Sequence, residues 1–245
     1  VVAYREVLLR QRVNDAAQSV MLAYAAGADL DHLAALYGVV RIADESDTRL
    51  RDRVLLTPDG WSVAGPAAAY RARAMAVSVD VRDAVATSPS PGDVVVTVLP
   101  EWTAADMPDI QARTDALCAA VLAAVNDRTV RPLTDRVTVS AAGSIAYRVV
   151  ARLTITSLPD AGVILADGTA AVRRYVADRR RLGVPIALSG LMQALHQPGV
   201  ERVRLLEPAD DIIPDPQQAA WCDSIDVALD TGAMDARQAG GVSDD

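Results

Sequence analysis

The sequence of 245 residues contains no lysine and no phenylalanine, and only two histidines and two cysteines. Without lysine there is no P-loop, Schiff-base enzyme or protein kinase, because each needs a lysine amine at its phosphates or carbonyl substrate. His32 and His196 have no HxH or HExxH neighbour, which excludes the zinc-hydrolase motifs. Cys118 and Cys222 lack CxxC spacing, and we interpret them as small apolar residues of a reducing compartment. Several large enzyme classes are therefore excluded.

Long apolar runs are also missing. The longest, Ala116–Val125, is well short of the roughly 18 residues that a membrane-spanning helix needs. The first residues, VVAYREVLLRQRVN, place arginines where a secretion signal would be apolar, so we expect neither a membrane span nor a signal. Because there is no initiator methionine, we expect that the chain was processed or that an N-terminal piece is missing.

The net charge of −8 is unevenly distributed. From Glu207 onward there are ten acidic residues and one arginine, a balance of −9. Residues 1–206 hold 22 acids and 23 arginines, a balance of +1. The body of the chain is nearly neutral, so it lacks the basic field of a general nucleic-acid-binding protein.

Apolar spacing of three and four residues predicts helices over the first third of the chain. We expect a first helix that ends at Gly27, a second capped by Asp29 or Asp31, and a third capped by Ser46 or Asp47. The expected apolar faces are Val13, Ala17, Val20, Met21 and Tyr24 in the first helix, Leu30, Leu33, Ala34 and Tyr37 in the second, and Leu50, Val54 and Leu55 in the third.

The third and fourth helices should be separated by a turn. TPDG at 57–60 has turn chemistry. Pro66 is placed to open a fourth helix from Ala67 to about Met75, because its missing N–H costs nothing in a first turn.

The apolar period changes to two at Val77 and predicts strands. We expect a strand from there to the turn SPSPGD at 88–93, and a returning strand over Val94–Leu99, forming a hairpin. A helix should follow, with Asp106 and Pro108 at its start, Asn126-Asp127 at its end, and an apolar side of Ile110, Leu117, Val121 and Val125. Arg136–Val139 is the expected third strand.

A second unit of the same kind should follow. Tyr147–Ile155, Val200–Leu206 and Ile225–Leu229 are expected strands. Val172, Tyr175, Val176 and Leu182 mark a helix ended by Gly183 and Pro185, and Ser189 is the expected cap of a short helix through Leu191, Met192 and Leu195.

These elements predict an α+β fold, with a helical region followed by two small α+β units whose sheets are mostly antiparallel or mixed. We divide the chain into a helical region (1–76), a β-β-α-β unit (77–142), a second α+β unit (143–230) and a flexible tail (231–245). Pro132 and Ala142-Gly143 are hinge candidates.

Two charged clusters have possible ligands. Asp210, Asp211 and Asp215 could hold calcium, but Pro214 and Pro216 stiffen the segment, and a solvated loop is the better interpretation. The arginine-rich segment RRYVADRRR (173–181) could bind phosphate, although a solvated face or a contact with an acidic protein surface is favoured.

Two further patterns suggest functions that we keep as alternatives. Leu30–Arg41 is similar to the first helix and turn of a helix-turn-helix DNA-binding regulator, but Asp44 and Glu45 stand where phosphates would lie. Ser189 and His196 could form a hydrolase pair, but the GxSxG elbow is absent. We therefore predict no catalytic residues, no metal site and no cofactor.

Six segments, in order, resemble the baseplate J-like family, the baseplate assembly J proteins of contractile-tailed phages and related particles. They are Tyr4–Arg41, Asp47–Val54 (DTRLRDRV), Ala67–Met75 (AAAYRARAM), Val81–Leu99 (VRDAVATSPSPGDVVVTVL), Val130–Val139 and Ile186–Ile212. The resemblance covers residues 4 to about 230. Relative to the family, an N-terminal segment is expected to be missing.

The resemblance implies a structural role without catalytic residues. Family members are wedge proteins that join neighbouring wedges into a ring around the baseplate hub, and the ring widens when the tail sheath contracts. The implied partners are other copies of the chain and other wedge or hub proteins, with no membrane, specific nucleic acid or small-molecule substrate. The implied location is the virion tail baseplate, after assembly in the bacterial host cytoplasm.

Overall fold

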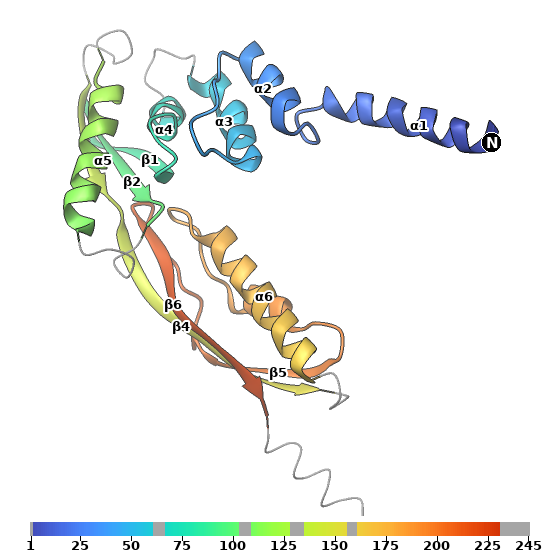
Figure 1. Ribbon diagram of the computed structural model, residues 1–245. Coiled ribbons are helices and arrows are strands. Elements are labelled where there is room, and N and C mark those ends of the chain that lie inside the picture. Colours follow the sequence, from blue (N-terminus) through green and yellow to red (C-terminus); the bar gives the residue numbers. More distant parts are fainter. Residues whose placement is uncertain (1, 61–66, 103–108, 128–134, 156–160, 231–245) are drawn as a thin grey trace, which may run out of the picture. The chain divides into compact units, whose positions relative to one another are not determined.

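A computed structural model describes residues 2–60, 67–102, 109–127, 135–155 and 161–230 (Figure 1). It confirms the α+β class: helices are followed by two three-stranded mixed sheets with their own helices. Contacts divide the chain into two compact units, Val1–Ala141 (unit 1) and Ala142–Asp245 (unit 2), each of which is described by itself. The predicted four-part division stays a prediction, and the predicted tail at 231–245 lies outside the described residues.

Unit 1 begins with α1 (Val2–Ser19) and α2 (Gly27–Leu36). The predicted first helix was too long, because it ends at Ser19. Gly27 opens α2 with a φ of +53°, so its left-handed conformation turns the chain into the second helix. The predicted caps of that helix are also wrong: its N-cap is Ala26, whose side chain makes no capping hydrogen bond, and neither Asp29 nor Asp31 is at the cap position.

Helix α3 (Asp47–Gly60) packs on α2 around a small apolar core. Ser46 caps it as predicted, because its Oγ accepts the Arg49 N–H at 3.3 Å. The predicted turn at 57–60 is wrong, since α3 continues through Pro58 to Gly60, and the Thr57 hydroxyl donates to the Arg53 carbonyl at 2.9 Å. The buried residues of this core are Ala25, Leu30, Ala34, Val39, Leu50 and Val54. The predicted core position Leu55 is exposed.

Helix α4 (Ala67–Met75) leads into the first sheet, and Pro66 lies outside the described residues. Strands β1 (Val81–Ser90) and β2 (Asp93–Pro100) form the predicted hairpin, with Gly92 at φ +84° in the turn. The predicted start at Val77 is wrong. Residues 77–80 are not strand, because the carbonyl of Ser78 is bound by an arginine side chain instead of a neighbouring strand.

Helix α5 (Ile110–Val125) connects β2 to β3 (Arg136–Ala141), which pairs with β2 in parallel. The predicted residues Asp106 and Pro108 lie outside the described residues, while Asn126 ends α5 as expected. Helices α4 and α5 contact the sheet, and their shared core includes Tyr70, Val96, Val98, Val121 and Val125.

Unit 2 has a sheet of order β5-β4-β6, in which β4 (Gly143–Ile155) is central. Strand β5 (Val200–Glu207) pairs with β4 antiparallel and β6 (Gln218–Leu229) pairs with it in parallel. Strand β6 begins seven residues before the predicted Ile225. The extra segment was missed because its apolar residues do not alternate, and the β4–β6 register shifts after Tyr147.

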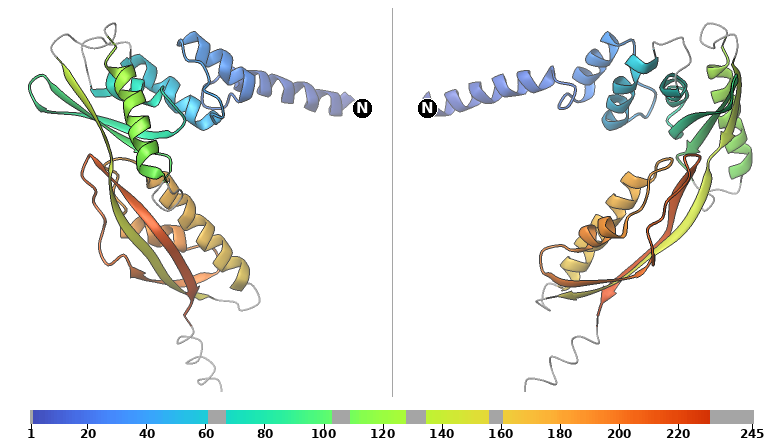
Figure 2. Two further views of the ribbon diagram at one scale, coloured as in Figure 1. Left: turned by 60° about the vertical axis from the view of Figure 1, so that its left-hand side comes forward. Right: turned by 180° about the vertical axis from the view of Figure 1, so that it is seen from behind.

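Helices α6 (Ala161–Arg179) and α7 (Leu188–Leu195) lie along one face of this sheet (Figures 1 and 2). The predicted helix around Val172 was placed too late, since α6 starts at Ala161 and ends before Leu182. The core between the helices and the sheet includes Val149, Leu153, Val172, Leu191 and Leu195, all fully buried.

Candidate functional site

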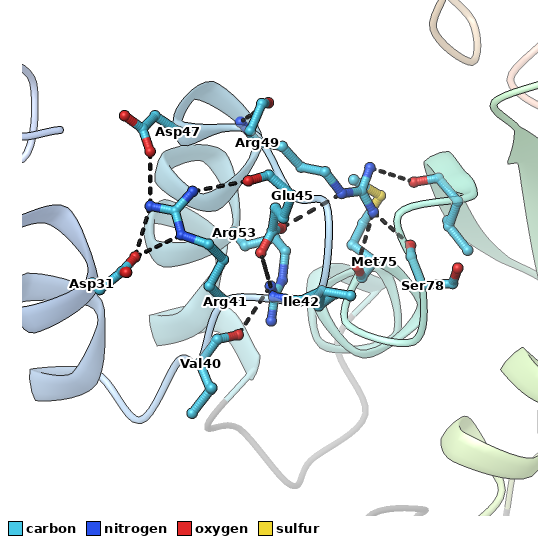
Figure 3. Close-up of polar contacts among 12 residues, drawn as sticks. Asp31, Val40, Arg41, Ile42, Glu45, Asp47, Arg49, Arg53, Met75 and Ser78 are labelled. Carbon is cyan, nitrogen blue, oxygen red and sulfur yellow. Dashed lines mark hydrogen bonds and ion pairs between the residues drawn. The ribbon is translucent and has the colours of Figure 1, made fainter. Parts of the chain in front are cut away.

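Arg41 joins the starts of α2 and α3 (Figure 3). Its guanidinium lies 2.6 Å from Asp31 Oδ1 and 2.7 Å from Asp47 Oδ1, and it donates to the carbonyl oxygen of Glu45 at 2.9 Å. Asp47 also accepts the backbone N–H of Gly27 at 3.0 Å. The Gly27 N–H and then the Arg41 guanidinium hold the pKa of Asp47 below its ordinary value, which favours the ionised carboxylate.

Glu45 is the buried carboxylate of this region, and its side chain is 0% exposed. Its Oε2 accepts from Arg53 Nη1 at 2.6 Å and from the Ile42 N–H at 3.0 Å, while Oε1 faces Arg49 Nε at 3.5 Å. The longer separation is ionic attraction without a strong hydrogen bond. Burial lowers the pKa of Arg49, and the charge of Glu45 opposes that shift, so the carboxylate stabilises the buried guanidinium charge.

Arg49 links α3 to the start of the first sheet. Its Nη1 donates to the carbonyl of Val81 at 2.7 Å, and its Nη2 donates to those of Ser78 at 2.7 Å and Met75 at 3.2 Å. These carbonyls belong to the end of α4, the turn after it and the first residue of β1. The arrangement is structural, because both terminal nitrogens of Arg49 donate to backbone carbonyls inside the protein, while its buried Nε is held only by the ion pair with Glu45.

The helix-turn-helix alternative at Leu30–Arg41 does not fit this geometry. The connection between α2 and α3 runs over ten residues, 37–46, whereas such a motif has a turn of three or four residues. Arg41, the arginine of this segment, forms ion pairs with Asp31 and Asp47. Nothing in this segment of the structure favours DNA binding.

Ser189 and His196 do not form a hydrolase pair. They lie at opposite ends of α7, about 10 Å apart along the helix axis at about 1.5 Å per residue. Ser189 is exposed, and no hydrogen bond joins the two side chains. The prediction that Ser189 caps α7 is also wrong, because the N-cap is Ala187 and the first helical N–H, that of Leu188, donates to Asp211 Oδ1 at 2.8 Å.

Removing the Asp211 side chain should therefore affect unit 2 more than removing the Ser189 hydroxyl. We expect Asp211→Ala to lower the free energy of unfolding by about 1 kcal/mol, the usual cost of a lost helix cap. Ser189→Ala should stay within about 0.5 kcal/mol of the wild type. Urea unfolding followed through Trp221 fluorescence measures both, and equal effects of the two substitutions would contradict this assignment.

The structure gives different surroundings to the two charged clusters of the sequence. Among the described residues no group of three or more His, Cys, Asp or Glu side chains could hold a metal ion. Of the arginines at 173–181, Arg179 lies over the Tyr175 ring at 5.5 Å and Arg180 over the Trp221 ring at 4.7 Å. Arg173, Arg174 and Arg181 are exposed.

Exposed apolar side chains are concentrated on the first helix and the turn after it, which hold eight of the sixteen large exposed apolar residues of the described chain. Residues 3–18 of α1 are all exposed. The large exposed apolar residues of this part are Tyr4, Val7, Leu8, Leu9, Val13, Val20, Met21 and Tyr24. The predicted apolar face of the first helix is thus solvent-facing in the isolated chain. In the described part of the chain, no helix has the length and hydropathy to cross a membrane.

Comparison with known proteins identifies the family. Residues 1–45 match the baseplate J-like N-terminal domain, and residues 62–141 match the baseplate J-like central domain. The chain is 38% identical to baseplate protein J of Escherichia phage P2 over 248 aligned residues, which cover 95% of this chain and 80% of that protein. The chain belongs to the baseplate J-like family. The resemblance predicted from the six sequence segments is confirmed.

A solved structure is also similar to this baseplate J-like protein. It is described as "Cryo-EM structure of the anti-feeding prophage (AFP) baseplate, 6-fold symmetrised", and the similarity has a TM-score of 0.46 at 14% identity. The match covers 76% of this chain and 43% of the other, so this chain spans less than half the length of that relative. The baseplate J-like family is one of structural proteins.

The buried network of this baseplate J-like protein was not predicted from the sequence. Glu45, Arg49 and Arg53 follow one another at intervals of four residues, the spacing that places charges on one helical face. That pattern could have indicated the ion pairs. It could not have indicated burial, which depends on how α4 packs against α3.

Proposed function

We propose that this chain is a non-enzymatic wedge subunit that joins neighbouring wedges of a contractile tail into the baseplate ring. Its partners are other copies of itself and other wedge or hub proteins. It works in the virion after assembly in the host cytoplasm, without a cofactor, metal ion, small-molecule substrate, membrane or specific nucleic acid. Membership of the baseplate J-like family supports this proposal.

The observation that carries the proposal is the uncovered first helix. An isolated helix of 18 residues is only marginally stable in water, so most helices gain stability by packing an apolar face. Leu9, Val13, Ala16 and Ala17 recur at helical spacing on α1 and are all exposed. A partner protein that covers this face would stabilise the helix and gain the burial energy of its apolar side chains.

Co-expression with the other tail proteins of the same particle tests the proposal. We expect at least one of them to co-purify with the wild-type chain and to be lost from the double variant Leu9→Glu, Val13→Glu, because charges on the apolar face oppose its burial. The matched control is Asn14→Asp, Gln18→Glu, which adds the same charge to the opposite face of α1. Retention of every partner by the Leu9 and Val13 variant would rule out this face, and failure of the wild type to bind any tail protein would reject the function.

A further inference from the structure

The sheet of unit 2 has one covered and one uncovered face. Helices α6 and α7 pack on the face that carries the alternate β4 residues Tyr147, Val149, Ala151 and Leu153. The intervening residues of β4, which include Arg152 and Thr154, belong to the opposite face, where Thr154 itself is buried. No described helix or strand of unit 2 lies over that face (Figure 2).

Strand β5 adds two free arginines to the uncovered face. Arg204 pairs in register with Arg152, and Arg202 pairs with Thr154. Arg152 forms an ion pair with Asp226 at 3.1 Å, but Arg202 and Arg204 are exposed and make no hydrogen bond or ion pair with the described residues. Like charges directly opposite each other on neighbouring strands are destabilising, so Arg204 opposite Arg152 is unfavourable in the isolated chain. We call Arg202 and Arg204 the arginine face.

The loop between β5 and β6 has the complementary charge. The carboxylates of Asp210 and Asp215 are exposed and form no ion pair with the described residues. The loop ends beside Gly143, because Gln218 donates its N–H to the Asp215 carbonyl at 2.8 Å and pairs with Gly143 in the sheet. We call Asp210 and Asp215 the acidic loop.

Within one copy, the described residues of these two surfaces form no ion pair with each other. The arginine face lies beside Thr154, near the end of β4, and Asp215 lies beside Gly143, at its start. Eleven steps of about 3.3 Å along β4 separate these positions, a distance of about 36 Å. The strands are paired along this length, so Asp215 cannot reach the free arginines of its own copy. Asp210, six residues after Arg204, forms no ion pair with them.

We propose that the arginine face of one copy binds the acidic loop of a second copy. The two surfaces differ, so the contact is head-to-tail, and repeating it produces either a ring or an open filament. Planar guanidinium groups suit carboxylates because they can donate two parallel hydrogen bonds. This inference rests on the proposed ring-forming function and names one of its contacts, separate from the surface of α1.

Charge reversal in the full-length chain tests the contact by sedimentation velocity over a range of protein concentrations. The wild type should self-associate at an ionic strength of about 0.1 M and dissociate at about 1 M, where the screening length falls from about 10 Å to about 3 Å. Arg202→Glu with Arg204→Glu should weaken association at least about tenfold, since attraction becomes repulsion. Asp210→Arg with Asp215→Arg should weaken it similarly.

A mixture of the two variants provides the decisive measurement. The reversed face of one variant then meets the reversed loop of the other, so we expect association to return to within about threefold of the wild type. The matched control is Arg173→Glu with Arg174→Glu, which changes the net charge equally on exposed residues of α6 and should leave association unchanged. Circular dichroism checks that each variant is folded.

Several outcomes would overturn the proposal. They are a mixture that stays dissociated, a control that weakens association as much as the face variant, and a wild type that is monomeric throughout. Binding of duplex DNA by the wild type that is lost in the face variant would assign the arginines to phosphate instead, and would also overturn it. None of these results changes the co-purification test of α1, so failure of this contact and failure of the proposed function are distinguishable.

Discussion

Replacing Glu45 by glutamine is expected to lower the free energy of unfolding of unit 1 by about 3 kcal/mol. The substitution keeps the size of the side chain and an acceptor for the Ile42 N–H, but it removes the carboxylate that pairs with the two shielded guanidinium groups of Arg49 and Arg53. Arg53 is 9% exposed and Arg49 is 16% exposed, so water compensates little for the lost charge. Removing one partner of a buried pair is costly because the other charge is left unpaired.

Hydrogen exchange with mass spectrometry measures this effect locally. Faster exchange is expected in α3, α4 and the start of β1, because Arg49 connects these elements through the carbonyls of Met75, Ser78 and Val81. Asp52→Asn is the matched control, since Asp52 is an exposed acid on α3, the helix that carries Arg49 and Arg53. This substitution should change stability by less than about 0.5 kcal/mol. A loss below about 1 kcal/mol for Glu45→Gln would mean that the pair behaves as a surface ion pair.

Adding a single methyl group at Gly190 should destabilise unit 2 by about 1–3 kcal/mol. A Cβ at this position would lie 2.6 Å from Cε2 and Cζ of Tyr175, which is closer than real carbon contacts. Tyr175 belongs to α6, and its hydroxyl accepts the Ala187 N–H at 3.2 Å just before α7 begins. Gly190→Ala must therefore displace the ring and weaken the bond that joins the two helices.

Two companion variants separate this clash from a general effect of replacing glycine. Gly162→Ala in α6 meets nothing within 4 Å and should be neutral or stabilising by up to about 1 kcal/mol, because alanine favours helix over glycine. Tyr175→Leu replaces the ring by a shorter side chain. In that background, Gly190→Ala should lower the free energy of unfolding less than it does in the wild type. Thermal or urea unfolding provides the values, and a Gly190→Ala protein as stable as the Gly162→Ala protein would contradict the close packing of α6 on α7.

Elements with strong local signals were predictable from the sequence. The hairpin of β1 and β2 combines alternating valines with a Pro-Gly turn, and α5 has apolar residues at Leu117, Val121 and Val125 on one helical face. Gly27 was predicted to end the first helix but opens the second, because a glycine with positive φ fits either position. A turn was wrongly predicted at residues 57–60, because a turn-like composition does not show whether the preceding helix continues through those residues.

Capping and pairing over long separations were not predictable. Ser189 has the right type and position for a cap, but the N–H of Leu188 is satisfied by Asp211, which is 23 residues away in the sequence. The pairing of β4 with β6 likewise joins segments that lie about 75 residues apart, and no local pattern reports such a choice. The exposure of α1 could not be predicted from the sequence either, because its apolar spacing is the same whether or not a partner covers the helix.

The order of characteristic segments alone determined the family, and the lack of lysine and of histidine motifs alone excluded several kinds of chemistry, because these properties belong to the residues themselves. Only the tertiary structure decided which charges are used inside the protein and which stay available. Arg49 and Arg204 have the same side chain, but α4 and β1 bring carbonyl groups to Arg49, whereas sheet pairing places Arg204 opposite Arg152 on an uncovered face. The environment of a guanidinium is set by residues far away in the sequence, and folding is what brings them together.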